Sequence, residues 1–167
     1  ATFAGVSKSV QVSVLAPVMA SLTIEPNAVV GGSSATGTLE LTAVAPSGGL
    51  VVSLASNKAD VVVPTTITIP AGATTVSFAV QSIKVASDAT ATITATLNGN
   101  TRTTQVRVVA HQLSSVAVTP SSVSGGSTFT GRVTLQQAAP AGGIVVSLST
   151  SDPAVSIPST VTIDAGK

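Results

Sequence analysis

Apolar and polar residues alternate with a period of two along most of the chain. In the stretch 89–97, for example, Ala, Ile, Ala and Leu alternate with threonine, and 76–81 and 105–109 show the same pattern. Successive side chains of a strand point to opposite faces, so this alternation predicts strands with one apolar and one polar face. No stretch offers an apolar stripe of helical spacing and useful length. The pattern therefore predicts an all-β protein.

Turn residues divide the alternating stretches into short strands. Pro46-Ser47-Gly48-Gly49 and Pro70-Ala71-Gly72 are turn signals, and Asn98-Gly99 is typical of a two-residue type I′ hairpin. Short strands at this spacing in an all-β chain predict a two-sheet sandwich. Between residues 20 and 110 we expect strands at 21–25, 36–44, 49–55, 60–69 (in one piece or two), 75–82, 89–97 and 101–110.

The sequence repeats itself without a gap at an offset of 94 residues, as in the pair Pro26 and Pro120. Gly31-Gly32 aligns with Gly125-Gly126 in the same register. Further aligned blocks are Pro46-Ser47-Gly48-Gly49 with Pro140-Ala141-Gly142-Gly143, and Val51-Val52-Ser53-Leu54 with Val145-Val146-Ser147-Leu148. A fixed period of this kind indicates a tandem array.

The repeat divides the chain into three parts. Residues 1–17 correspond to the last strand of one repeat, 20–111 form a complete repeat, and 113–167 form the first part of a following one. We interpret the chain as a segment of a longer array. Strand donation between copies, in which 1–17 completes 113–167, is an alternative. The missing counterpart of 74–96 counts against it, because that gap is larger than one strand.

Composition excludes several classes of protein. The 167 residues include no Cys, Trp or Tyr, only 8% are charged, and the formal net charge is +1. Without cysteine the chain has neither a disulfide framework nor a thiolate metal site. Its small net charge gives no basic surface of the kind that binds nucleic acid. The mean hydropathy is +0.58, but no apolar run reaches the length of about 20 residues that a membrane-spanning helix needs.

The repeat also tests each candidate site, because a site built into the module should recur in both copies. No acidic residue recurs: Glu25 aligns with Thr119, and Asp60 aligns with Ala154. Turn and core residues are the ones retained. His111, the sole histidine, has no second His, no Cys and no nearby acid, so we expect a linker residue rather than a base or metal ligand.

Asp60 and Asp88 are the strongest candidates for a calcium site, but no acidic run of calcium-loop type is present. We expect them to be solvated loop acids. Phe3, Phe78 and Phe129 occupy alternating positions typical of a core, which argues against stacking on sugar rings. Threonine suits exposed strand faces, and O-glycans on these residues are the alternative interpretation. We therefore expect no catalytic, cofactor-binding or metal-binding residues.

The blocks PSGGLVVSLAS (46–56) and IPAGATTVSFAV (69–80) make the sequence resemble the immunoglobulin-like repeats of bacterial secreted and surface proteins. These repeats are similar in architecture to fibronectin type III and invasin-type modules. The resemblance covers essentially the whole chain, and the Cys–Trp–Cys core of antibody domains is absent. It implies tandem immunoglobulin-like sandwiches with adhesion, stalk or spacer roles, and it carries no catalytic residue.

Together these observations predict a non-enzymatic structural module of a prokaryotic extracellular or cell-surface protein: an adhesin stalk, surface layer or filament. The partners we expect are neighbouring repeats of the same chain and copies that pack laterally or donate strands, with no nucleic acid, no membrane insertion and no cofactor. Junctions as short as His111-Gln112 would hold neighbouring repeats stiffly. The alternative is an accessory module of a large secreted polysaccharide-degrading enzyme, and the neighbouring gene sequence would discriminate between the two.

Overall fold

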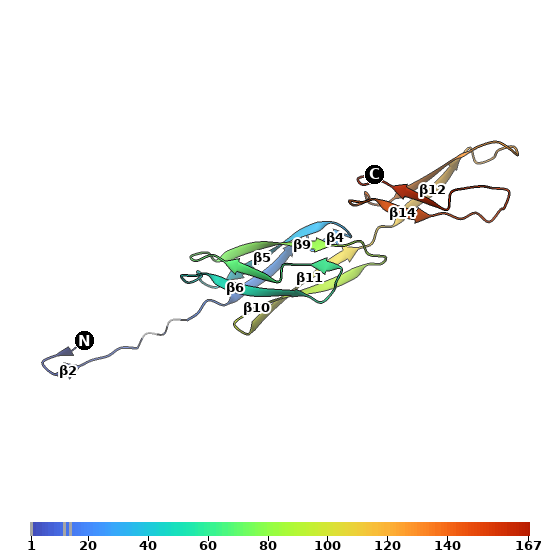
Figure 1. Ribbon diagram of the computed structural model, residues 1–167. Helices are drawn as coiled ribbons and strands as arrows, with labels where there is room; N and C mark the ends of the chain where they lie inside the picture. The colour runs from blue at the N-terminus through green and yellow to red at the C-terminus, as the bar shows by residue number, and fades with distance from the viewer. Residues whose placement is uncertain (1, 12, 14) are drawn as a thin grey trace.

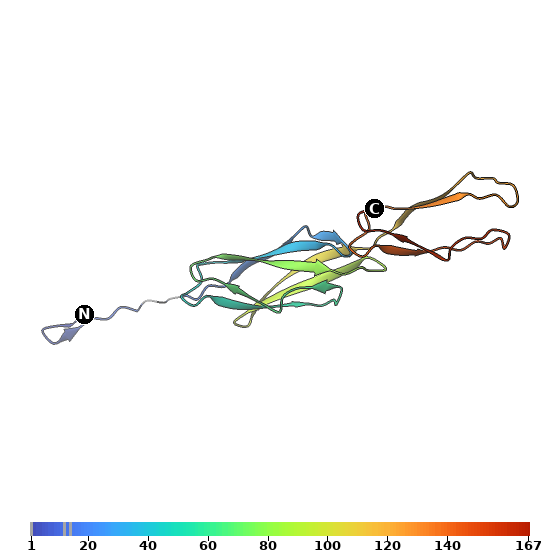
Figure 2. The same ribbon diagram turned by 45° about the horizontal axis from the view of Figure 1, so that its top comes forward.

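The computed structural model describes residues 2–11, 13 and 15–167, and this part of the chain contains strands and turns but no helix. The predicted all-β class is confirmed. The described parts follow one another along one long axis (Figures 1 and 2). A small N-terminal hairpin lies at one end, the largest body of sheet in the middle, and a smaller group of strands at the C-terminal end.

Two sheets form the middle body. The first has the order β3-β5-β9-β7, and the second has the order β4-β11-β10-β6-β8. Their bounds are β3 Met19–Glu25, β4 Ala28–Val30, β5 Ser34–Leu41, β6 Leu50–Ser56, β7 Val61–Val62, β8 Thr66–Ile69, β9 Thr75–Ser82, β10 Ala89–Leu97 and β11 Asn100–Val109. The predicted strands are present within a few residues. The stretch 60–69 is divided, and its two pieces lie in different sheets.

The sequence pattern did not predict the strand β4, but it did predict the hairpin of β10 and β11. β4 has only three residues and pairs in parallel with the far end of β11, at the edge of the sheet. Three residues are too few to show an alternation. The hairpin of β10 and β11 turns through Asn98 and Gly99, whose φ angles of 49° and 80° are both positive, as a type I′ turn requires.

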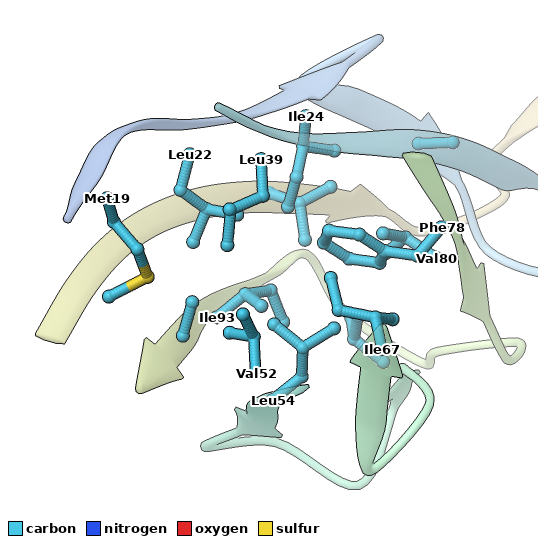
Figure 3. Close-up of a cluster of buried hydrophobic side chains, with 14 of the residues drawn as sticks. Met19, Leu22, Ile24, Leu39, Val52, Leu54, Ile67, Phe78, Val80 and Ile93 are labelled. Atoms are coloured by element: carbon cyan, nitrogen blue, oxygen red, sulfur yellow. The ribbon is translucent and has the colours of Figure 1, made fainter. Parts of the chain in front are cut away.

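A single apolar core lies between the two sheets (Figure 3). Leu39 of β5 faces it from one sheet, while Val52 of β6 and Ile93 of β10 face it from the other, and all three are fully buried. Every second residue of β10 is buried from Ala91 to Leu97, as the alternation predicts. Phe78 is the core aromatic, and its ring lies directly over Gly37 of the neighbouring strand. This core makes the middle body a β-sandwich.

The C-terminal part has two separate two-stranded sheets. β12 (Leu113–Thr119) pairs with β13 (Thr130–Leu135), and β14 (Ile144–Ser147) pairs with β15 (Thr160–Ile163). Val133, Ile144 and Leu148 are only half-buried, and the single buried apolar residue among 113–167 is Ala139. In the middle body, β9 extends the sheet of β3 and β5, and β10 and β11 extend the sheet of β6 and β8, whereas residues 113–167 contain only these four strands.

Backbone details recur at the 94-residue offset. The Ala45 N–H donates to the Ala73 carbonyl and the Ala45 carbonyl accepts from the Gly72 N–H. Ala139 makes the equivalent pair of hydrogen bonds with Lys167 and Gly166. The peptide bonds before Pro26 and Pro120 are both cis. At these positions the middle and C-terminal parts therefore adopt the same local backbone.

The N-terminal part is a short hairpin of β1 (Thr2–Phe3) and β2 (Val6–Ser7), which pair only with each other. The interpretation of Phe3 as a core residue was wrong, because its side chain is 87% exposed. Its alternating position is real, but no second sheet lies against this hairpin. Phe78 is buried as expected, and Phe129 is half-buried.

Candidate functional site

Asp60 and Asp88, the two acids considered for calcium, line the same open hollow on the middle body. The hollow has a volume of about 480 Å³ and is also lined by Lys58 and Lys84. Calcium takes six to eight oxygens, usually from several carboxylates, whereas this hollow pairs two acids with two lysines. The described residues contain no group of three or more His, Cys, Asp or Glu side chains that could hold a metal.

The Asp88 carboxylate is engaged in a structural contact. Its Oδ1 accepts a hydrogen bond from the Ala110 backbone N–H at 2.9 Å, and its Oδ2 accepts one from the Arg107 guanidinium at 2.6 Å. The hydrogen bond from Ala110 and then that from Arg107 lower the pKa of Asp88 below its usual value of 3.8. Asp88 thus fastens the end of β11, just before the junction, to the loop that leads into β10.

His111 lies in the junction between the middle and C-terminal parts. Its Nε2 is 3.2 Å from the Ala138 carbonyl oxygen, and since a carbonyl only accepts, Nε2 is the donor. The Gln112 carbonyl accepts a second hydrogen bond across the same segment, from the Gln136 N–H. Among the described residues no acidic side chain is hydrogen-bonded to the ring. The imidazole therefore connects the junction at His111 to the backbone at Ala138.

A second hollow lies in the C-terminal part, between its two small sheets. It has a volume of about 620 Å³ and is lined mainly by apolar side chains, among them Val118, Phe129, Val133, Leu148 and Val161. These residues occupy positions that face the core in the middle body, where Val133 corresponds to Leu39 and Leu148 to Leu54. The hollow is therefore bordered by the inner faces of the two small sheets, and its polar lining residues include Arg132 and Thr150.

Sequence reasoning did not identify the contact between the middle and C-terminal parts. The Lys84 ammonium donates a hydrogen bond of 2.6 Å to the Gly143 carbonyl, 59 residues away. Beside it, Gly32 lies so close to Pro140 that a Cβ on Gly32 would be 2.8 Å from the proline Cβ. The sequence pattern singled out Gly31-Gly32, because this pair recurs at the 94-residue offset. It did not single out Lys84.

The remaining acids are also in structural or exposed positions. Glu40 of β5 accepts a hydrogen bond of 3.3 Å from the Ser21 hydroxyl across the β3–β5 pair, and Glu25 is exposed at the end of β3. Arg107 and Asp88 form an ion pair, the one salt bridge found among the described residues. These polar groups are spread over the surface and do not converge on one cavity.

Comparison with known proteins leaves the chain unassigned: no family model matches it, and no curated protein sequence matches it. Within the described residues no helix is long and apolar enough to cross a bilayer.

Proposed function

We propose that this chain is a segment of a tandem array of immunoglobulin-like sandwiches that acts as a non-catalytic structural spacer in a prokaryotic extracellular or cell-surface protein. The order of strands in the middle body supports the immunoglobulin-like assignment. Immunoglobulin domains place their first, second, fifth and fourth strands in one sheet, and β3-β5-β9-β7 has this order when the short edge strands β4 and β8 are left out of the count. The opposite sheet contains the third, sixth and seventh strands, as in β6-β10-β11.

The recurrence of the backbone at the 94-residue offset supports the tandem arrangement. The turn at Gly48-Gly49 has φ angles of 101° and 75°, and the turn at Gly142-Gly143 has 84° and 66°. Ala4 and Gly5 likewise repeat the positive φ angles of Asn98 and Gly99. On this proposal the boundaries are 1–17, 20–111 and 113–167, as the sequence predicts.

The observation that carries the structural role is the direct end-to-end contact between the middle and C-terminal parts, through Lys84 and Gly143. A binding or catalytic domain needs a concave site with converging polar groups, whereas a spacer needs stable modules joined along an axis. The groups that recur at the offset are mainly those of turns and core, and no acidic residue is retained where the copies overlap.

Two measurements test the structural role. Small-angle scattering of the full chain should give an elongated particle, and a compact particle would contradict a spacer. Antibodies raised against the chain should label intact cells of the source organism without permeabilisation. Labelling only after lysis would overturn the proposed location. The alternative of an enzyme accessory module predicts a catalytic domain encoded in the same gene.

A further inference from the structure

We propose that Lys84 and Gly32 form a specific joint with the turn at 140–143, and that this joint fixes the orientation of one sandwich relative to the next. The inference rests on the proposed function as a spacer and adds its mechanical basis. The partner of the Gly32–Lys84 end is a Pro-x-Gly-Gly turn of an adjacent unit of the same kind.

The chemical part of the joint is the bond from the Lys84 ammonium to the Gly143 carbonyl. Hydrogen bonds from a charged donor are stronger than neutral ones, and this one is partly shielded from water. Lys84 lies just after β9, where the Ile83 N–H donates to the Asp60 carbonyl and so fixes the backbone. The lysine therefore leaves the first unit from an ordered position and ends on the backbone of the second.

The steric part of the joint is the contact of Gly32 with Pro140. A Cβ on Gly32 would lie 2.8 Å from the Pro140 Cβ, which is closer than side-chain carbons approach one another. Glycine at this position lets the two units touch. Gly32 also has a φ angle of 92°, so its backbone favours glycine independently.

The turn that receives Lys84 is formed before docking. Its internal hydrogen bond, from the Gly143 N–H to the Pro140 carbonyl, measures 2.9 Å, and the same bond from Gly49 to Pro46 also measures 2.9 Å. The two turns share the Pro-x-Gly-Gly sequence and the positive φ angles of its glycines, so this sequence favours the conformation by itself. Binding to a surface that is already formed costs little conformational entropy, which favours a defined geometry.

His111 and Gln112 restrict the same joint from the other side. The imidazole donates to the Ala138 carbonyl, and Gln112 accepts from the Gln136 N–H, so the linker itself is bonded to the second unit. The linker and the Lys84 contact together hold the second unit at separate points. Two bodies held in this way cannot rotate freely about the linker.

The test is a distance measurement between spin labels in the full chain, which contains no native cysteine. One label replaces the exposed Thr103 of β11, and the other replaces Val145 of β14, which is 64% exposed. We expect one narrow distance distribution in the parent chain. Lys84→Met removes the ammonium but keeps the length of the side chain, and it should broaden the distribution. Gly32→Val should shift or broaden it.

Lys58→Met is the matched control, because Lys58 lines the same hollow as Lys84 but makes no contact with the C-terminal part in the described structure. It should leave the distribution narrow. Labels at Thr36 and Thr103, both in the middle sandwich, should give the same narrow distance in every variant and so report that this sandwich stays folded.

A parent chain as broad as Lys84→Met would overturn the joint, and so would equal broadening by Lys58→Met. A broad distribution in the parent chain would leave an array with flexible links, which is still a spacer. The proposed function fails separately, by a compact particle in scattering or by the absence of the protein from the cell surface.

Discussion

At the scale of single residues, the pair of Gly37 and Phe78 shows how a small residue makes room for the core aromatic. A Cβ on Gly37 would fall within 2.2 Å of the Phe78 ring, whereas a Cβ on the equivalent Gly131 would meet nothing within 4 Å. Both glycines lie in strands and have no positive φ angle, so the difference is one of packing.

We predict that Gly37→Ala destabilises the chain by about 1–3 kcal/mol, the usual cost of overpacking a well-filled core. Gly131→Ala should be neutral or slightly stabilising, since alanine restricts the unfolded chain more than glycine does. Urea unfolding of the two variants measures the difference. Equal losses for both would contradict the assignment of the effect to the Phe78 ring.

Asp88 leads to a prediction on pH. Its pKa is lowered in the folded state, so its contribution to stability is present above the unfolded value of about 3.8 and disappears as the pH falls through the lowered folded value. Asp88→Asn should therefore be less stable than the parent chain at neutral pH and should approach it well below pH 3.8. Urea midpoints across this range measure the effect.

The control for Asp88 is Asp60→Asn, because the Asp60 side chain makes no hydrogen bond in the described structure. At neutral pH this substitution should change the urea midpoint less than Asp88→Asn does. A difference between Asp88→Asn and the parent chain that stays constant down to the lowest pH would contradict the role of the carboxylate charge.

At the scale of strands, equivalent side chains are buried to different extents in the middle and C-terminal parts. Ile69 of β8 is fully buried between two sheets, whereas the equivalent Ile163 of β15 is only half-buried. Both pair in the same way with the strand beside them, Ile69 with Leu50 and Ile163 with Ile144. What differs is the opposite sheet.

We predict that Ile69→Ala costs about 2–5 kcal/mol of stability, because it leaves a cavity in a closed core. Ile163→Ala should cost clearly less, because its side chain borders an open hollow. Chemical denaturation of the two variants in the full chain gives the comparison. An equal cost would mean that the C-terminal part is as well packed as the middle sandwich.

At the scale of the whole molecule, the proposed boundaries predict which part folds alone. A chain of residues 20–111 contains both sheets and, apart from Met19 at the start of β3, every residue of the core, so it should fold as a monomer. A chain of residues 113–167 exposes the inner faces of its strands. Covering each large apolar side chain is worth about 1.5–3 kcal/mol, against total stabilities of about 5–15 kcal/mol.

Residues 113–167 alone should therefore be disordered or should associate through unpaired strand edges. Hydrogen exchange distinguishes the two fragments: slow exchange in the core strands of 20–111, and fast exchange throughout an unassociated 113–167. A monomeric, well-protected 113–167 would show that the repeat boundaries are wrong.

The sequence by itself determined every strand of the middle sandwich except β4, the faces these strands bury and the turn at Asn98-Gly99. These depend on interactions between residues close in the chain: the alternation along β10 requires only the pleat of one strand, and the hairpin requires two residues with positive φ angles. The recurrence at 94 residues was equally visible, and it separated turn and core residues from acids that do not recur.

The tertiary structure alone decided which sheet each strand joins and what lies opposite each face. The two pieces of 60–69 have the same β-branched character, yet β7 pairs with β9 and β8 pairs with β6. Phe3 and Phe78 both follow a polar residue and precede an alanine, but only Phe78 has a second sheet above it. The contact of Lys84 with Gly143 joins residues 59 positions apart, and an exposed lysine carries no local pattern that names its partner. Burial and docking depend on surfaces that exist only after distant segments have come together, which is why the pattern of single strands could not supply them.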